Sequence, residues 1–169
     1  MRAAATTAAV RPKEFHFPLS VEWIAGRRVA AQVEGKRTIE IAPPPVFHGT
    51  DPSAWSPEDF FVAAAASCLA VTFAGLAATA GLWYAGLKVD GDGVVGLRRD
   101  GRFGFTRLLL RFEVEVGPTD EMRARELAEK AEASCLVSAS IDLPVETVIK
   151  VRAVTSPCAV SSLASSAAS

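Results

Sequence analysis

The sequence contains few of the residues that usually ligate metals or build disulfide scaffolds. Its two histidines, His16 and His48, lie far apart, and its three cysteines are an odd number. The cysteines, Cys68, Cys135 and Cys158, are widely separated and form no CxxC pair. These absences argue against a zinc site and against a secreted disulfide-stabilised domain, and they favour a reducing, cytoplasmic compartment.

A strong net charge is also absent. The chain has 18 lysines and arginines against 19 aspartates and glutamates, a formal net charge of -1. Such a balance lacks the basic surface typical of proteins that bind nucleic acid or anionic membranes. We therefore expect neither as the main partner. Because 50% of the residues are hydrophobic, we expect either a large core shared between subunits or a membrane span.

One long apolar segment, Ser56–Leu82, dominates the sequence. Ser56 suits the N-cap of a helix, Pro57 suits its first position, and Glu58 places negative charge in the first turn. A helix that is apolar on all sides must be buried. This one is long enough to span a bilayer, but Ala, Gly, Thr and Ser dominate it, which favours a buried helix of a soluble protein.

The rest of the chain predicts strands and a second helix around this segment. Alternation of apolar and polar residues predicts six strands, the first of them within Phe15–Ala25. The helix after Pro118 is amphipathic, with an apolar stripe through Met122 and Cys135, and Gly86 is the expected stop of the first helix. We predict one α+β domain over residues 15–154, with a disordered leader at 1–14 and a disordered tail at 155–169. The five further strand segments are Arg27–Glu34, Thr38–Ile41, Leu87–Leu97, Phe103–Val116 and Pro144–Val154.

Two motifs resemble the OsmC/Ohr family of osmotically inducible and organic hydroperoxide resistance proteins. The first is SPE at 56–58 followed by FFVAAAASC up to Cys68, and the second is KAEASCLVS around Cys135. The resemblance covers roughly Val21 to Val154 and points to a broader OsmC-like branch. It implies an OsmC-type α+β fold, with antiparallel strands around a long buried apolar helix, a second amphipathic helix and an intertwined homodimer.

The resemblance also implies an activity, that of a thiol-dependent peroxidase acting on organic hydroperoxides in the response to oxidative stress. In that family the first cysteine, here Cys68, becomes a sulfenic acid. The second, here Cys135, then forms a Cys68–Cys135 disulfide that an external dithiol, of lipoyl type, reduces. No metal, flavin or haem cofactor is implied. The alternative function is that of a non-catalytic member of the fold, which binds a small ligand or senses oxidants.

Two charged residues complete the site that the resemblance implies. Glu58 stands ten residues before Cys68, and Arg27 follows Gly26 in the first hairpin, with Arg28 as an open alternative. Cys68 lies about three turns inside its helix, where the helix dipole has faded, and burial raises the pKa of a thiol. We therefore expect an added cation to activate Cys68, held by Glu58 of the same chain or of a partner chain.

Some residues depart from the pattern of the family or have simpler interpretations. Leu136 replaces the usual proline after the second cysteine, which bears on the resolving step more than on the peroxide step. Cys68 and Cys135 could both be inert core residues, and Cys158 is most simply an incidental free thiol. The physiological peroxide and the reductant are not encoded in any motif.

Overall fold

The computed structural model describes residues 14–155, and contacts divide the chain into two compact units, Met1–Ser56 and Pro57–Ser169. Each unit contains its own sheet of three strands. The predicted leader and tail, apart from Glu14 and Thr155, lie outside the described residues, as does Cys158.

The first unit is the antiparallel meander that the alternating segments predict, with strand order β1-β2-β3. Gly26, at φ +56°, makes the turn between the first two strands, a conformation that glycine adopts without strain. Few of its side chains are buried, and Trp23, for example, is 72% exposed. The elements are β1 (Ser20–Ala25), β2 (Arg28–Gln32), β3 (Ile39–Ile41) and the short 3-10 helix η1 (Pro45–Phe47).

The second unit is built on a long hairpin with a third strand at its edge. Strand β4 (Tyr84–Leu97) pairs antiparallel with β5 (Phe103–Val116), and β6 (Val145–Ala153) pairs parallel with β5. The predicted Asp-Gly turn is present, with Gly101 at φ +80°. The parallel β6 departs from the expectation of antiparallel strands, because a helical crossover returns the chain to the edge of β5.

The described helices of this unit are α1 (Pro57–Ala80), before β4, and α2 (Glu121–Ala133) and α3 (Leu136–Ala139), between β5 and β6. Helix α1 begins where the capping signals predict. It ends at Gly81, φ +64°, where the Leu82 N–H donates to the Ala77 carbonyl at 2.9 Å in the pattern of a Schellman motif. The prediction that Gly86 ends this helix is wrong, since Gly86 lies inside β4.

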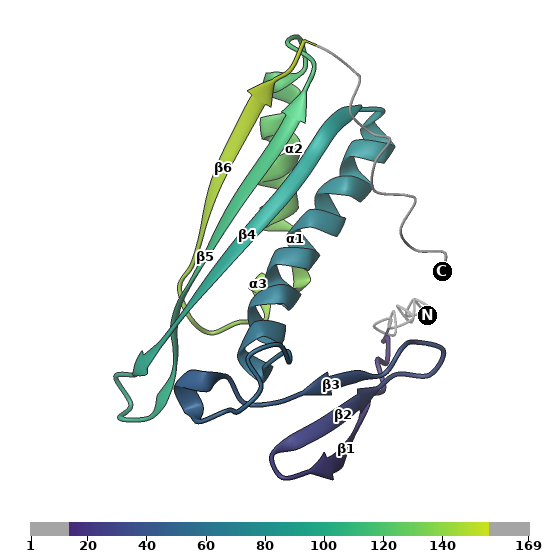
Figure 1. Ribbon diagram of the computed structural model, residues 1–169. Coiled ribbons are helices and arrows are strands. Elements are labelled where there is room, and N and C mark those ends of the chain that lie inside the picture. Colours follow the sequence, from purple (N-terminus) through teal and green to yellow (C-terminus); the bar gives the residue numbers. More distant parts are fainter. Residues whose placement is uncertain (1–13, 156–169) are drawn as a thin grey trace, which may run out of the picture. The chain divides into compact units, whose positions relative to one another are not determined.

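The core of the second unit lies where α1 and α2 cover one face of the sheet (Figure 1). Strand β5 buries alternate residues, as its pattern predicts, and Phe112 is at the centre. The Phe73 ring of α1 packs edge-on against Phe112, with ring centroids 4.9 Å apart. The buried side chains of β5 and α1 are Leu108, Leu110, Phe112, Val114, Val116, Ala65, Leu69, Phe73 and Ala77.

Each helix buries a narrower or different stripe than expected. In α1 only one stripe is buried, and Val71 on another side is 71% exposed. In α2 the buried stripe consists of alanines, whereas Met122 is exposed. Helix α1 is long and apolar enough to cross a membrane by length and composition. Its buried stripe nevertheless packs on β5 and α2, as a core helix of a folded domain does.

Candidate functional site

The two cysteines of the motifs come together beside the middle of α1. Cys68 is carried by α1 and is partly exposed, and Cys135 is 1% exposed; both thiols are free. The sequence predicted Cys135 on the amphipathic helix, and this prediction is wrong. Helix α2 ends at Ala133, and Cys135 is the extended residue, φ -69° and ψ 109°, from which α3 starts. Figure 1 shows α3 beside α1, which places the second motif next to the first.

The surroundings of Cys68 favour its thiolate. Burial by itself raises the pKa of the Cys68 thiol, as the apolar helix predicts. The backbone N–H of Val137 opposes this effect most, followed by the Cys135 thiol, the Thr72 hydroxyl and the Leu136 N–H. Together these donors hold the pKa of Cys68 below its ordinary value. Neutral donors therefore lower this pKa within the described residues, and the expected cation stays a prediction.

The backbone donors come from the first turn of α3, whose N–H groups have no partner within the helix. Leu136 and Val137 are the first two residues of α3, directly after Cys135. A proline in place of Leu136 would have no N–H to offer. The leucine that departs from the family pattern thus adds a hydrogen-bond donor to the site.

Two hydroxyl groups of the site were not predicted from the sequence. Thr72 follows Cys68 by four residues on α1, and Ser138 follows Cys135 by three. The Ser138 Oγ donates to Cys135 Sγ at 3.2 Å. Thr72 is one helical turn after Cys68 on the same face, and Ser138 is three residues after the N-cap Cys135; these spacings are the signal that could have found them.

Glu58 lies in the first turn of α1, where it was predicted to start the helix. Its Oε2 atom is buried and has no hydrogen-bond partner in the part of the chain that the structure describes. A buried carboxylate oxygen is costly unless a donor or a cation pairs with it. Glu58 is therefore suited to hold a cation.

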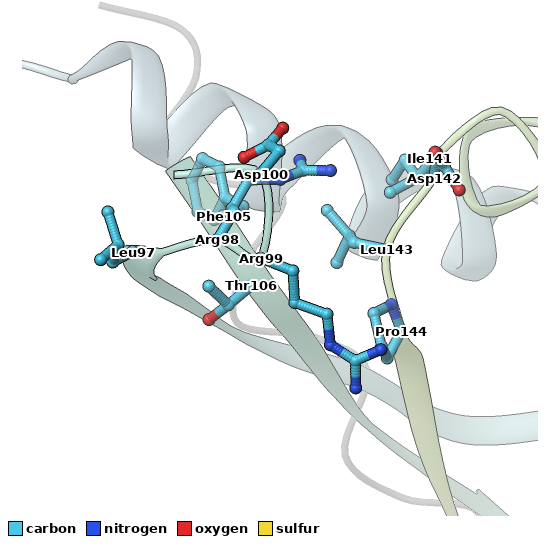
Figure 2. Close-up of a pocket in the computed structure, with 10 residues that line it drawn as sticks. All are labelled: Leu97, Arg98, Arg99, Asp100, Phe105, Thr106, Ile141, Asp142, Leu143 and Pro144. Carbon is cyan, nitrogen blue, oxygen red and sulfur yellow. The ribbon is translucent and has the colours of Figure 1, made fainter. Parts of the chain in front are cut away.

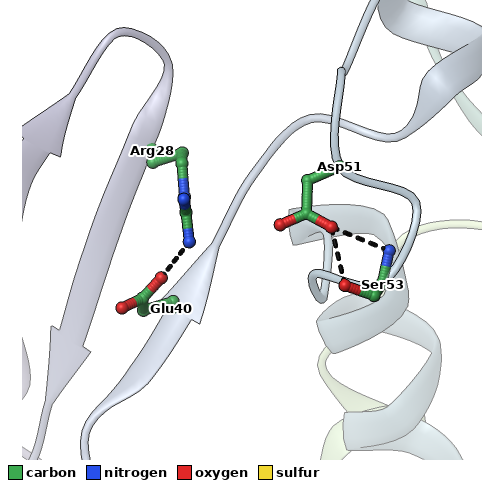
Figure 3. A network of polar contacts seen from close by, with 4 residues as sticks. All are labelled: Arg28, Glu40, Asp51 and Ser53. Carbon is green, nitrogen blue, oxygen red and sulfur yellow. Dashed lines mark hydrogen bonds and ion pairs between the residues drawn. The ribbon is translucent and has the colours of Figure 1, made fainter.

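The two candidate arginines belong to the first unit, and Cys68 and Glu58 to the second. Arg27 stands in the β1–β2 turn, where its Nη1 donates to the Phe47 carbonyl at 2.9 Å. Arg28 instead forms an ion pair with Glu40 across β2 and β3 (Figure 3). Of the two, Arg27 is the one whose positive charge has no carboxylate partner among the ion pairs of the described residues.

The loop before α1 has local order of its own. Asp51 accepts hydrogen bonds from the Ser53 hydroxyl at 2.7 Å and from the Ser53 N–H at 3.0 Å (Figure 3). These bonds, the hydroxyl first, lower the pKa of the Asp51 carboxyl. Asp51 therefore stays ionised, and its hydrogen bonds with Ser53 stabilise this part of the loop before α1.

An open pocket of about 800 Å³ lies at the far end of the β4–β5 hairpin (Figure 2). Phe105, on its wall, stacks on Phe61 of α1 with ring centroids 4.3 Å apart. Two arginines and two aspartates line the pocket, so their charges balance. None of the predicted site residues lines it. The lining residues are Leu97, Arg98, Arg99, Asp100, Phe105, Thr106, Ile141, Asp142, Leu143 and Pro144.

The described residues offer no set of side chains that could ligate a metal ion. Among residues 14–155, no group of three or more His, Cys, Asp or Glu side chains could hold a metal ion. The arrangement around Cys68 and Cys135 instead offers a stabilised thiolate with a second thiol within hydrogen-bonding reach. Such a pair can be oxidised in two steps, through a sulfenic acid to a disulfide.

Comparisons with known proteins agree with the motifs. A family model described as OsmC-like protein matches residues 49–150, more than half of the 169-residue chain. The uncharacterized protein YmaD of Bacillus subtilis (strain 168) is 28% identical over 138 residues, covering 79% of this chain and 91% of YmaD.

Two solved structures share the arrangement of elements. An OsmC-like protein of unknown function from Vibrio cholerae gives a TM-score of 0.74 at 20% identity, covering 80% of this chain and 99% of that one. An organic hydroperoxide resistance protein from Elizabethkingia anophelis gives a TM-score of 0.66 at 18% identity, covering 85% and 100%. These likenesses confirm the predicted fold.

Proposed function

The chain belongs to the OsmC-like protein family, and from this premise we propose that it is a cysteine-based peroxidase for organic hydroperoxides. One observation carries the proposal: the Cys135 thiol lies beside Cys68 and is among the donors that lower the pKa of the Cys68 thiol. A thiolate is the nucleophile that a peroxide needs. The Elizabethkingia anophelis neighbour, named for organic hydroperoxide resistance, supports the substrate class.

The proposed reaction uses sulfur alone. The Cys68 thiolate attacks the terminal oxygen of the hydroperoxide, the O–O bond breaks, and the alcohol leaves with one proton. Cys68 is then a sulfenic acid. Cys135 attacks that sulfur, which releases water and forms the Cys68–Cys135 disulfide. An external dithiol, of lipoyl type, reduces the disulfide by exchange, so no metal, flavin or haem takes part.

Arg27 and Glu58 have supporting roles in this proposal. The buried Oε2 of Glu58, which has no partner within residues 14–155, would be stabilised by a cation. Arg27 has no carboxylate partner among the ion pairs of the same residues. A guanidinium held by a carboxylate would stabilise the oxyanion that develops as the O–O bond breaks. In this proposal the neutral donors stabilise the thiolate before the reaction, and Arg27 stabilises the negative charge that develops during it.

A homodimer is part of the proposal, because each unit leaves apolar surface exposed. On α1 the exposed residues Ala64, Ser67, Val71, Gly75 and Ala78 follow one side of the helix. In the first unit, Phe17 is 90% exposed. A meander of three strands with so small a core is marginal by itself. A second copy of the chain would cover these surfaces, in the cytoplasm and without a membrane or a nucleic acid.

A turnover assay tests the proposed function. The full chain is mixed with tert-butyl hydroperoxide and dihydrolipoamide, and peroxide loss is followed with wild type, Cys68→Ser and Cys135→Ser. We expect Cys68→Ser to abolish turnover and Cys135→Ser to retain only the first, stoichiometric step. A wild type that consumes no peroxide beyond background would favour a ligand-binding or sensing protein instead.

A further inference from the structure

The hydroxyl of Ser138 is aimed at a sulfur atom, which is an unusual partner for a serine that has backbone groups nearby. Its Oγ donates to Cys135 Sγ at 3.2 Å, and sulfur accepts hydrogen bonds only weakly. Ser138 is half-buried, and Cys135 is buried. Water therefore has little access to this sulfur, which accepts a hydrogen bond from the Ser138 hydroxyl.

The start of α3 explains why the two side chains meet. Cys135 is the N-cap residue of α3, and Ser138 is the third residue inside the helix. A side chain at that position can reach back to the N-cap residue, as the glutamate of a capping box does. Here it reaches the sulfur, and the Cys135 side chain makes no capping bond of its own. The geometry is thus set by the helix and does not depend on a mobile loop.

Ser138 thus donates to Cys135, and the Cys135 thiol is in turn among the groups that lower the pKa of Cys68. We propose that Ser138 is a positioning residue for the resolving step of the peroxidase cycle. This inference rests on the proposed function. Its content is that the hydroxyl holds the Cys135 sulfur toward Cys68 and stabilises negative charge on that sulfur as it attacks.

The step balances without another reagent. The Cys135 sulfur attacks the Cys68 sulfenic acid, the S–S bond forms, and the S–O bond breaks. The leaving hydroxide takes the Cys135 proton and departs as water, while the two electrons already taken by the peroxide remain with the alcohol product. In a buried setting, a neutral donor stabilises the charge on the attacking sulfur where water cannot.

The test separates the two steps of the cycle in single turnover. Reduced full chain is mixed with one equivalent of tert-butyl hydroperoxide. Alcohol release reports the peroxide step, and quenched peptide mass mapping reports the Cys68 sulfenic acid, its sulfinic product and the disulfide. The variants are Ser138→Ala, the hydroxyl-retaining Ser138→Thr, and Ser140→Ala as a matched control. Ser140 carries its hydroxyl in the same turn but donates it to the Leu136 carbonyl at 2.8 Å.

We expect Ser138→Ala to slow disulfide formation about tenfold, the effect of one lost hydrogen bond to a developing charge. Sulfenic acid on Cys68 should accumulate before the disulfide forms, while the rate of alcohol release stays within about twofold of wild type. Ser138→Thr should restore the disulfide rate, and Ser140→Ala should match wild type.

Other outcomes overturn the inference in distinguishable ways. An unchanged disulfide rate in Ser138→Ala, or equal slowing in Ser140→Ala, removes the role of Ser138 and leaves the peroxidase intact. Loss of alcohol release in Ser138→Ala, in parallel with the disulfide, assigns Ser138 to the fold of the whole site. A wild type that forms no sulfenic acid on Cys68 overturns the proposed function together with this role.

Discussion

At the scale of single residues, small neutral donors lower the pKa of the Cys68 thiol. Burial raises the pKa of the thiol, and backbone N–H groups, the Cys135 thiol and the Thr72 hydroxyl together reverse the effect. The thiolate fraction increases as the pH passes upward through the pKa. A lowered pKa therefore moves the onset of reactivity below that of free cysteine, whose pKa is about 8.5.

Thr72 offers a direct test of this account. Thr72→Val keeps the shape of the side chain but removes the hydroxyl, so the pKa of Cys68 should rise and the thiol should alkylate more slowly at pH 7. Thr79→Val is the matched control, because the Thr79 hydroxyl donates to the Gly75 carbonyl at 2.9 Å on the same helix. The rate of alkylation by iodoacetamide, measured against pH, gives the pKa of Cys68 and its rate of reaction at pH 7. Equal titration curves for wild type and Thr72→Val would contradict the role of Thr72.

Residue patterns also decided what could be predicted from the sequence. Cys68, Cys135 and Glu58 stood out because each belongs to a motif. The backbone N–H groups of Leu136 and Val137 have no side-chain signature, so their part in the site could be seen only in the structure. The expected cation followed from burial and from the distance to the helix end, without these backbone donors in view.

At the scale of elements, α3 is the feature that links the two cysteines. It starts at Leu136, directly after Cys135, and turns its first N–H groups toward Cys68. Its four residues are too few for a periodic pattern, so the sequence placed Cys135 on the preceding helix instead. The start of α1 was predictable because an N-cap is a local signal, whereas the helix stops at Gly81 and not at the predicted Gly86. The parallel direction of β6 was not, since pairing depends on contacts distant in sequence.

A proline at the start of α3 tests its electrostatic role. Proline suits the first position of a helix, so Leu136→Pro should keep α3 folded. It removes one N–H donor, and the pKa of Cys68 should therefore rise. Leu136→Ala retains the N–H and serves as the control for the lost side chain, which is exposed. The titration of Cys68 would refute this role if Leu136→Pro left it unchanged while circular dichroism showed a native fold.

At the scale of the whole molecule, exposed apolar surface supports the proposed dimer. Val71 is 71% exposed on a helix that carries no charge beyond its first turn. The proposed dimer predicts a molar mass, by light scattering, of twice the 17.8 kDa of one chain. Val71→Glu should shift the mass toward one chain, since an unpaired charge is costly in an interface. Met122→Glu, at an equally exposed position of α2, should leave it unchanged; a monomeric wild type would contradict the dimer.

In the proposed function, Cys68 reduces an organic hydroperoxide, and Cys135 then converts the Cys68 sulfenic acid to a disulfide. The most direct measurement treats the reduced full chain with one equivalent of tert-butyl hydroperoxide and quantifies both the alcohol and the cysteine products. The account predicts one alcohol per chain and a Cys68–Cys135 disulfide in the peptide map. Unreacted peroxide, or a disulfide that joins Cys158 instead, would contradict it.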